Sequence, residues 1–377
     1  MIPYSRQSIS EKDIEEVVKI LRSDMITQGP SNKNFEEEIC SYTTCKYSIL
    51  TNSATSALHL ACLALGLGPN DILWTSPNSY VASANVGLFC NANVDFVDIE
   101  LETYNMCVNS LEEKLRLAEI NGKLPKIVMP VHFAGQSCDM ASISKLANKY
   151  GFRVIEDGSH AIGGKYHGKP IGSCTYSDIT VFSFHPVKII TTGEGGSAVT
   201  NDPLLFENLR LLCSHGVTRD PNKMETKTES LWVYDQIKLG FNYRMSDLNA
   251  ALGSNQLKRI GEFTKRRHEI ADKYDEELSQ SNLIIPYRDP NNHSSLHLYP
   301  IQVNQRLQVF NSLHKEGIKV NVHYRPIHTQ PYWKKRGFLP GDFPNSETYY
   351  SKAISLPIYF DLTNEQQDKV IKVLSFI

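Results

Sequence analysis

The chain has 377 residues, 41% hydrophobic and 21% charged, which is the composition of an ordinary folded protein. Its net charge of −2 provides no basic field, so neither a nucleic acid nor a membrane is expected as a partner. Its eight cysteines form no CxxC and have no closely spaced histidines, which argues against a metal site and against disulfides. The N-terminus also lacks the apolar core of a signal peptide, and a cytoplasmic location is therefore expected.

Two helices are predicted near the N-terminus. The first follows Ser10, because Ser10 and Asp13 have the spacing of a capping box and apolar residues recur on one face from Ile14 to Leu21. The second covers residues 54–66. It is apolar almost all round, which predicts that it is buried.

Short apolar runs then alternate with helical stretches. The strands are predicted at 72–75, 94–97, 126–131, 152–155 and 179–184, and the helices at 81–90 and 140–150. This alternation is typical of an α/β fold with a large, mostly parallel sheet that is buried on both faces.

The pattern changes after residue 255. A charged helical stretch covers 256–280, and strands at 296–303 and 319–322 flank a helix at 305–316. We therefore expect a large domain over 1–255, which includes an N-terminal arm, and a smaller α+β domain over 256–377.

Residues 181–196 read VFSFHPVKIITTGEGG. A strand carries Ser183 and Lys188 towards its carboxyl end, where α/β folds place ligands. There Ser183 can hold an anion while Lys188 reaches a reactive carbonyl, and the following glycines let the backbone approach closely. A lone lysine in such a place is usually a surface residue. Its neighbours here favour a reactive amine.

Residues 154–161 read VIEDGSHA. Asp157 follows a buried strand, and a carboxylate there can pair with a protonated ring nitrogen and keep that ring electron-withdrawing. His160 can face the same ring. On this motif alone, a turn aspartate and a core histidine remain an open alternative.

Residues 52–58 read NSATSAL and open the apolar helix. Free N–H groups and the helix dipole make this start a natural phosphate seat, although the motif alone favours an ordinary N-cap. Neither a GxGxxG after a strand nor GxxxxGK[ST] occurs, which counts against a nicotinamide-dependent enzyme and a P-loop protein.

Together these segments resemble the DegT/StrS-type sugar aminotransferases, which have the aspartate-aminotransferase fold (fold type I) and use pyridoxal 5′-phosphate (PLP). The likeness runs from Tyr4 to Leu356. The matching stretches are MITQGP, TNSATSALHLA, VIEDGSHA, VFSFHPVKIITTGEGG, SHG, GFNYRMSDLNAALG and VHYRPIH.

The resemblance implies a role for each matching residue around the cofactor ring. Lys188 is expected to bind the PLP aldehyde and to act as general base and acid, for which its pKa must be lowered. Asp157 is expected to pair with the pyridine nitrogen, His160 to lie near the 3-hydroxyl, and Tyr80 to stack on the ring.

The resemblance also implies how the phosphate is held. The backbone at Ala54 and Thr55 is expected to bind it together with Ser183. Asn242, in GFNYR, is expected to reach it from the neighbouring subunit, which implies a homodimer with shared active sites.

The substrates implied are L-glutamate as amino donor and a nucleotide-linked keto sugar as acceptor. The narrowest expectation is a UDP-linked 4-keto-6-deoxy-N-acetyl hexosamine, giving UDP-4-amino-4,6-dideoxy-N-acetyl-altrosamine for pseudaminic acid biosynthesis. The candidate residues at the substrate end are Tyr4, Arg6, Thr27, His215, Tyr299, His323 and Tyr324.

Three other readings stay open. One is an aminotransferase for another nucleotide-linked 3- or 4-keto sugar, carried by dTDP or GDP. A second is a PLP-dependent sugar dehydratase, but such members of the family carry histidine at the position of Lys188, which favours transamination. A third is a non-catalytic PLP-binding regulator, which should lack the lysine or the aspartate.

Overall fold

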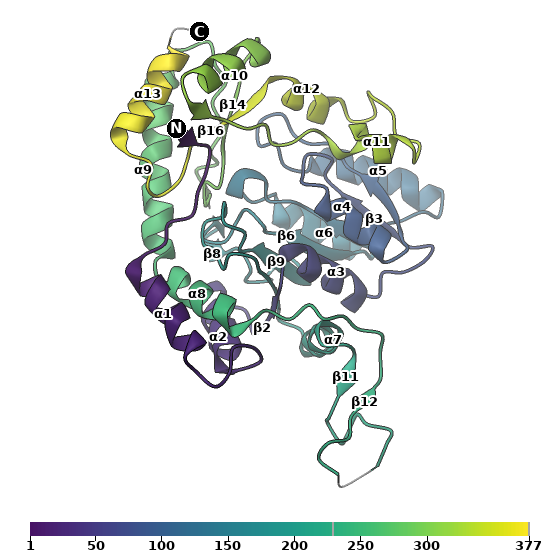
Figure 1. Ribbon diagram of the computed structural model, residues 1–377. Coiled ribbons are helices and arrows are strands. Elements are labelled where there is room, and N and C mark those ends of the chain that lie inside the picture. Colours follow the sequence, from purple (N-terminus) through teal and green to yellow (C-terminus); the bar gives the residue numbers. More distant parts are fainter. Residues whose placement is uncertain (228–229, 376–377) are drawn as a thin grey trace.

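The computed structural model describes residues 1–227 and 230–375. Its central sheet has the strand order β2-β10-β9-β6-β5-β3-β4 (Figure 1). The strands are β2 (Tyr47–Thr51), β10 (Gly196–Thr200), β9 (Ile179–Ser183), β6 (Arg153–Asp157), β5 (Ile127–Met129), β3 (Ile72–Thr75) and β4 (Asn93–Phe96). Neighbours pair in parallel except where β10 runs antiparallel to β2 and β9, so the predicted mostly parallel sheet is confirmed.

Helices cover both faces of this sheet. They are α3 (Ala54–Ala64), α4 (Ala82–Phe89), α5 (Val108–Ile120), α6 (Met140–Tyr150) and α7 (Pro203–Cys213). Along β5, Ile127 and Met129 pack in one apolar cluster with α3 and α7, whereas Val128 packs in another with α5 and α6. This period-two alternation explains why the strands read as nearly continuous apolar runs. Helix α3 is buried from Ser56 to Cys62, as its apolar surface predicts.

Strand β6 is longer than the apolar pattern predicts, because it includes the polar residues Glu156 and Asp157. The Asp157 N–H donates to Pro130 O at 2.9 Å, and the His132 N–H donates to Asp157 O at 3.1 Å. Backbone pairing with the segment after β5 therefore continues past the last apolar side chain, and Asp157 is the final residue of the strand rather than the start of a turn.

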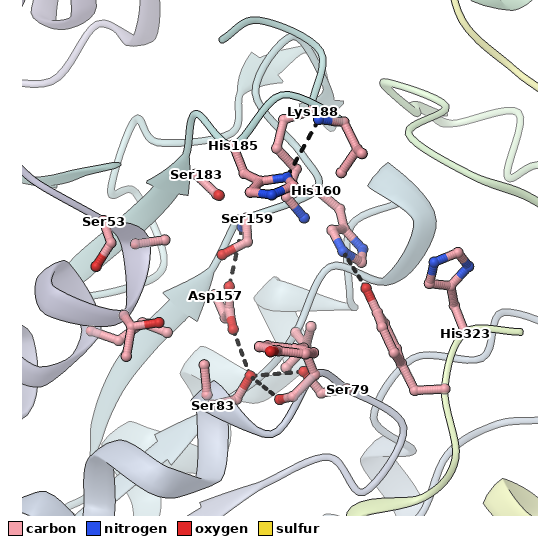
Figure 2. Close-up of a pocket in the computed structure, with 18 of the residues that line it drawn as sticks. Ser53, Ser79, Ser83, Asp157, Ser159, His160, Ser183, His185, Lys188 and His323 are labelled. Carbon is pink, nitrogen blue, oxygen red and sulfur yellow. Dashed lines mark hydrogen bonds between the residues drawn. The ribbon is translucent and has the colours of Figure 1, made fainter. Parts of the chain in front are cut away.

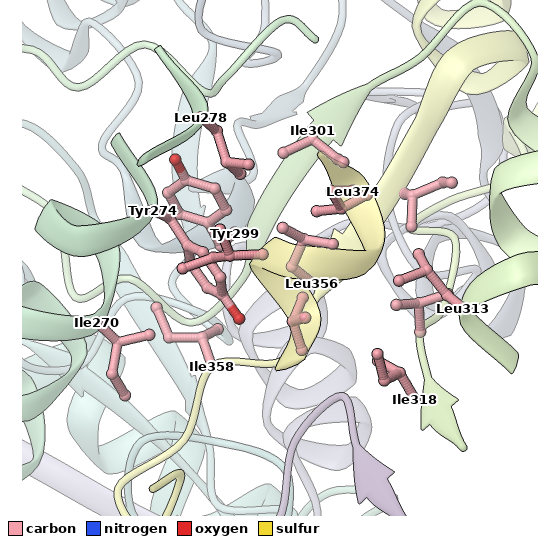
Figure 3. Close-up of a cluster of buried hydrophobic side chains, with 14 of the residues drawn as sticks. Ile270, Tyr274, Leu278, Tyr299, Ile301, Leu313, Ile318, Leu356, Ile358 and Leu374 are labelled. Atoms are coloured by element: carbon pink, nitrogen blue, oxygen red, sulfur yellow. The ribbon is translucent and has the colours of Figure 1, made fainter. Parts of the chain in front are cut away.

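A second core lies beside the sheet (Figure 3). It is built by α9 (Ile260–Leu278), β14 (Tyr299–Gln302), α10 (Arg306–Lys315), β15 (Ile318–Lys319), β16 (Ala353–Leu356) and α13 (Asn364–Leu374). The N-terminal β1 (Ile2–Pro3) pairs with β15 and contributes Ile2 to this core. The predicted division between residues 255 and 256 falls within α8 (Asp247–Lys258), and we retain two domains as a proposal.

The remaining elements are short, apart from α2. They are α2 (Pro30–Thr43), β7 (Lys165–Tyr166), β8 (Lys169–Pro170), β11 (Val217–Thr218), β12 (Asp235–Gln236), β13 (Asn292–His293), α11 (Pro331–Lys334) and α12 (Pro344–Lys352), with 3-10 turns at Phe133–Gly135 and Ile327–Thr329. The antiparallel pair β11–β12 stands away from the body (Figure 1). In the described part of the chain, no helix has the length and hydrophobicity needed to cross a bilayer.

Helix α1 (Glu11–Leu21) begins with the predicted capping box, but its apolar side is not part of the core. Ile14 and Leu21 are 47% and 58% exposed, whereas Asp13 is fully buried. The Asp13 carboxylate accepts hydrogen bonds from the Ser10 N–H and from the side chains of Asn255 and Gln256 in α8. A buried carboxylate, not apolar packing, therefore anchors α1.

We expect Asp13→Ala to lower the free energy of unfolding by about 2–4 kcal/mol, because it leaves several buried donors without an acceptor. The N-terminal segment should also become more sensitive to protease. Glu16→Ala is the matched control, since among the described residues Glu16 pairs only with Lys19, at the surface. Equal thermal midpoints for the Asp13 and Glu16 variants would contradict this account of α1.

Candidate active site

A cavity of about 910 Å³ lies at the carboxyl ends of β6 and β9 (Figure 2). Its volume is at the upper end of the range for small-molecule sites. The predicted site residues that line it are Tyr4, Ala54, Thr55, Tyr80, Asp157, His160, Ser183, Lys188, His323 and Tyr324. Residues from six separate segments of the chain therefore meet at one edge of the sheet.

Parallel pairing explains how Asp157 and Lys188 come together. Asp157 ends β6 opposite Val181 of β9, and Ser183 ends β9 two residues later. After that strand the chain turns tightly, with the Lys188 N–H donating to His185 O at 2.9 Å, so the lysine stays beside the strand ends. Neighbouring parallel strands end at the same edge, which makes this edge the usual place for ligands.

Burial dominates the electrostatics of the Lys188 amine. It lowers the pKa of Lys188 to about 8, although the nearby Asp157 carboxylate acts in the opposite direction. No hydrogen bond between the two side chains is present in the described structure. An amine with a pKa near 8 is unprotonated often enough at neutral pH to act as a nucleophile or base.

Asp157 is held through both carboxylate oxygens and is only 4% exposed. Its Oδ2 accepts a hydrogen bond from the Ser83 hydroxyl at 2.7 Å, and its Oδ1 accepts one from the Ser159 N–H at 3.1 Å (Figure 2). An ionised carboxylate has about four acceptor positions, so Asp157 retains capacity to bind a ligand donor.

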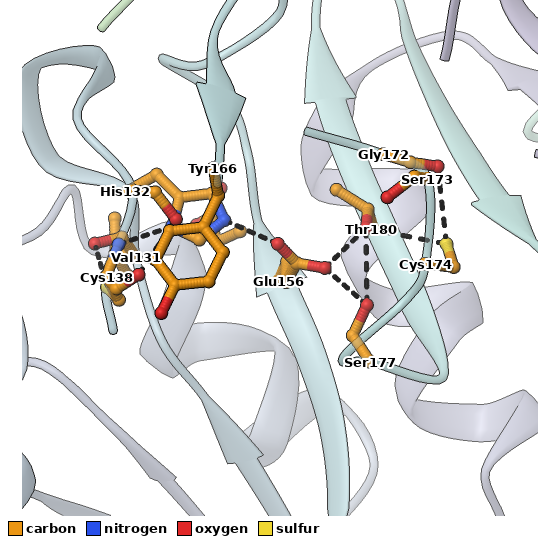
Figure 4. A network of polar contacts seen from close by, with 12 residues as sticks. Val131, His132, Cys138, Glu156, Tyr166, Gly172, Ser173, Cys174, Ser177 and Thr180 are labelled. Carbon is orange, nitrogen blue, oxygen red and sulfur yellow. Dashed lines mark hydrogen bonds and ion pairs between the residues drawn. The ribbon is translucent and has the colours of Figure 1, made fainter. Parts of the chain in front are cut away.

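The preceding residue, Glu156, belongs to a different polar network on the other side of the strand (Figure 4). Its carboxylate accepts hydrogen bonds from His132 Nε2 at 2.7 Å, from Thr180 at 3.0 Å and from Ser177. Burial by itself raises the pKa of Glu156, but these hydrogen bonds outweigh it and the pKa is lowered. Because consecutive side chains alternate across a strand, the Glu156 network fixes β6 from behind while Asp157 faces the cavity.

His160 is a buried, neutral imidazole. Burial, followed by the charges of Lys188 and His323, holds the pKa of His160 well below its usual value. Its Nε2 lies 3.2 Å from the Tyr324 hydroxyl, while its Nδ1 has no hydrogen-bond partner among the described residues. An unpaired buried nitrogen is costly, which suits a site that is completed by a ligand.

The start of α3 forms an anion seat. Ser53 caps the helix by accepting a hydrogen bond from the Ser56 N–H, and the first-turn amides of Ala54 and Thr55 line the cavity. These amides have no intrahelical partners, and the helix dipole favours negative charge there. A Cβ on Gly196 would lie 2.6 Å from Ala54 N, so only glycine lets β10 run this close to the helix start.

The far wall of the cavity is aromatic and uncharged. Tyr80 is 62% exposed, and its ring centroid lies 6.2 Å from that of Tyr324. The ring centroids of Tyr4 and His323 lie 5.2 Å apart. Burial, followed by the Lys188 charge, lowers the pKa of His323 to about 3, and its Nδ1 lies 2.8 Å from the Ser355 hydroxyl.

The cavity therefore offers an amine, a carboxylate, an unpaired imidazole nitrogen and an anion seat. These groups match the aldehyde, ring nitrogen, 3-hydroxyl and phosphate of PLP, so the residues present fit this cofactor. In the described part of the chain, no group of three or more His, Cys, Asp or Glu side chains is placed to hold a metal ion.

Five predicted residues lie outside the cavity. Arg6, Thr27, His215 and Asn242 are exposed on this chain. Tyr299 is fully buried in the second core, where its hydroxyl donates to Asp275 at 2.6 Å and its ring packs on Tyr274 (Figure 3). The structure contradicts the expectation that Tyr299 contacts substrate. Tyr299 belongs to the fully buried strand β14, and its side chain packs in the second core.

Several cavity residues were not anticipated from the motifs. Ser79 and Ser83 flank Tyr80 four residues apart, and Ser83 reaches Asp157. The helical spacing rule could not reveal this pair, because Ser83 lies in α4 whereas Ser79 precedes the helix. Asn321 and Glu194 also line the cavity. Glu194 belongs to the segment 181–196 that the sequence singles out, whereas nothing in the sequence context of Asn321 distinguishes it from a surface polar residue.

Comparison with known proteins agrees with this geometry. Residues 7–375 match the DegT/DnrJ/EryC1/StrS aminotransferase family. A UDP-4-amino-4,6-dideoxy-N-acetyl-beta-L-altrosamine transaminase of Campylobacter jejuni is 39% identical over 383 residues, covering 99% of this chain and 96% of the relative.

Solved structures show the same likeness. The PMP form of the putative sugar aminotransferase Spr1654 from Streptococcus pneumoniae superposes with a TM-score of 0.91 at 31% identity, covering 100% of this chain and 98% of that one. Helicobacter pylori PseC, described as an aminotransferase involved in the biosynthesis of pseudoaminic acid, superposes with a TM-score of 0.90 at 30% identity, covering 100% of both chains. Spr1654 is also solved in a PLP form. The chain belongs to the DegT/DnrJ/EryC1/StrS aminotransferase family and is a PLP-dependent sugar aminotransferase.

Proposed function

We propose that this enzyme transfers the amino group of L-glutamate to a UDP-linked 4-keto-6-deoxy-N-acetyl hexosamine. The product is UDP-4-amino-4,6-dideoxy-N-acetyl-altrosamine, for pseudaminic acid biosynthesis. The observation that carries the chemistry is the meeting of a weakly basic Lys188 and a hydrogen-bonded Asp157 in one cavity. The choice of sugar is supported by the two Campylobacter transaminases, at 39% and 37% identity, and by the likeness to PseC.

When bound, PLP supplies an electron sink for the carbon that loses its proton. Lys188 holds the cofactor and, once released from it, moves a proton between the donor carbon and the cofactor. The burial that lowers its pKa to about 8 makes the amine a competent base at neutral pH. Because Asp157 is not hydrogen-bonded to Lys188, the amine is free to move while the carboxylate stays in place.

The remaining cofactor contacts are assigned from their positions in the cavity. Asp157 accepts a hydrogen bond from the protonated ring nitrogen, and the unpaired Nδ1 of His160 is available to the 3-hydroxyl. The amides of Ala54 and Thr55 bind the phosphate with Ser183, and Tyr80 covers the ring. Tyr4, His323 and Tyr324 form an uncharged hydrogen-bonding wall, which suits the hydroxyl and acetamido groups of a sugar.

We also propose a homodimer in which each active site is completed by the partner. Among the residues described, Lys188 is the only lysine or arginine that lines the cavity, so one chain offers no cation for a nucleotide diphosphate. In the segment that begins at residue 230, the side chains of Leu231, Trp232 and Leu239 are 91%, 77% and 80% exposed. Apolar exposure of this size is typical of an interface, and Asn242 lies exposed close by in sequence.

A cytoplasmic location is supported by eight free thiols.

The substrate proposal predicts that the purified enzyme, given L-glutamate and UDP-linked 4-keto-6-deoxy-N-acetyl hexosamines, forms 2-oxoglutarate and one 4-amino sugar. Mass spectrometry and product NMR measure the outcome. A parallel panel of dTDP- and GDP-linked keto sugars is the control. Amination of dTDP-linked hexoses alone would overturn the UDP assignment and leave the transaminase intact. Loss of water without nitrogen transfer would instead indicate a dehydratase.

The pKa of Lys188 predicts how the apoenzyme takes up PLP. Below about pH 8 most of the amine is protonated and cannot attack the aldehyde, so the rate of covalent uptake should rise with pH and level off above about 8. Stopped-flow absorbance measures this rate, and borohydride reduction followed by peptide mapping should find the tag on Lys188. Lys188→Arg is the control, because it keeps a cation but should not react. A tag on another lysine would defeat the assignment.

The homodimer proposal predicts complementation between two inactive variants. In a mixed dimer of Lys188→Ala and Asn242→Asp chains, one site carries both changes and the other carries neither. Random mixing should therefore restore about a quarter of wild-type activity, since half of the dimers are mixed and each has one intact site. Each variant mixed with itself is the control. No recovery in a mixture that demonstrably exchanges subunits would show that Asn242 acts within its own chain.

A further inference from the structure

The orientation of the Asp157 carboxylate depends on one hydroxyl group. The backbone of Asp157 is fixed at both its N–H and its C=O, by Pro130 O and by the His132 N–H of the segment that follows β5. The Glu156 network behind the strand adds to this rigidity (Figure 4). The side-chain torsions of Asp157 are then the remaining freedom, and the only side chain that bonds the carboxylate in the described structure is that of Ser83.

Ser83 has a single proton to donate, and the distances decide where it goes. Its Oγ lies 2.7 Å from Asp157 Oδ2 and 3.4 Å from Tyr80 O. The shorter contact is a good hydrogen bond to a charged acceptor and the longer one is weak, so the proton lies on the Asp157 side.

A second hydroxyl supports the first. Ser79 Oγ lies 2.7 Å from Ser83 Oγ (Figure 2). Because the Ser83 proton is committed to Asp157, the proton between the two serines comes from Ser79. The result is a directed chain from Ser79 to Ser83 to Asp157, in which each hydrogen bond polarises the next. Ser79 and Ser83 are 4% and 1% exposed, so water does not compete for these groups.

The chain also fixes the geometry of the ring site. Ser79 and Ser83 flank Tyr80 at the start of α4, so the segment that carries the exposed aromatic ring is tied to the carboxylate. Two hydroxyl groups therefore set the distance between the segment that carries Tyr80 and the Asp157 carboxylate. We propose that Ser83, supported by Ser79, is a positioning residue that aims Asp157 at the ring nitrogen of the cofactor and keeps the proton on that nitrogen.

This inference rests on the proposed role of Asp157. Without the Ser83 hydroxyl, the carboxylate rotates more freely and holds its negative charge less well, so the proton shared with the ring nitrogen moves towards Asp157. The ring then withdraws electrons less strongly. Holding the cofactor depends on several other groups, whereas proton removal from the donor depends on the ring, so the loss should fall on kcat more than on cofactor affinity.

We expect Ser83→Ala to lower the rate of the glutamate half-reaction by about 10- to 100-fold, the effect of one hydrogen bond to a charged group. The PLP dissociation constant should rise less than about tenfold by the same reasoning. The pH profile of the visible absorbance of the cofactor-loaded enzyme should shift as well. Ser79→Ala should produce the same changes at a smaller size. Ser83→Thr, which keeps the hydroxyl, should recover most of the rate.

Ser197→Ala is the matched control. Ser197 is fully buried on β10, and its hydroxyl has no partner among the described residues, so its loss should leave the rate and the pH profile unchanged. If Ser83→Ala does not fold, Ser79→Ala and Ser83→Thr carry the comparison. The proposal would be overturned if Ser83→Ala kept a half-reaction rate within about twofold of wild type and an unshifted pH profile. If Ser83→Ala does not fold, the same criterion applies to Ser79→Ala.

A double-variant cycle separates positioning from a general structural role. If Ser83 acts through Asp157, adding Ser83→Ala to Asp157→Asn should cause no further loss of rate. An equal loss in both backgrounds would refute the inference. Borohydride labelling of the wild type is run beside it. A wild type that does not carry the cofactor on Lys188 would mean that the proposed function has failed, and that outcome is distinct from a failure at Ser83.

Discussion

The chemistry of this protein depends on keeping a buried amine and a buried carboxylate close together without letting them bond to each other. Burial pushes the pKa of Lys188 down to about 8, and Asp157 is near enough to oppose that shift but not to cancel it. The carboxylate is instead occupied by Ser83 and Ser159. Had the two side chains formed a direct ion pair, the lysine would have stayed protonated and the carboxylate would not have been available to a ring nitrogen.

The sheet helps to meet this requirement because consecutive side chains along a strand point to opposite faces. Glu156 and Asp157 are adjacent carboxylates, yet one is consumed by a structural network behind β6 and the other faces the cavity. The same period of two sends Ile127 and Val128 of β5 into different apolar cores. The hydrogen bonds of the Glu156 network satisfy that carboxylate, whereas His160 Nδ1, which has no partner among the described residues, belongs to a residue that lines the cavity.

The surface suggests that one chain is only part of the working enzyme. The described cavity has an aromatic, uncharged wall and a single cation, which by itself is poorly suited to a nucleotide diphosphate. The exposed apolar residues include Ile14 and Leu21 of α1 and, on either side of β12, Leu231, Trp232 and Leu239. In the proposed homodimer, the partner would cover the apolar surface and complete the site.

The amino-acid sequence alone was enough to identify the α/β sheet and the family, and it singled out Lys188 and Asp157, which the structure places in one cavity. Each of these inferences depends on local order: strand periodicity, a short motif, or a residue at a strand end. The sequence did not reveal that β6 continues through Asp157, that Tyr299 is a core residue, or that Ser83 reaches the carboxylate. The first depends on backbone pairing with Pro130 and His132, the second on packing between α9 and β14, and the third on a contact across 74 positions of the chain. Such features arise from which segments become neighbours in space, and spacing along the chain carries no information about that; only the folded structure determines it.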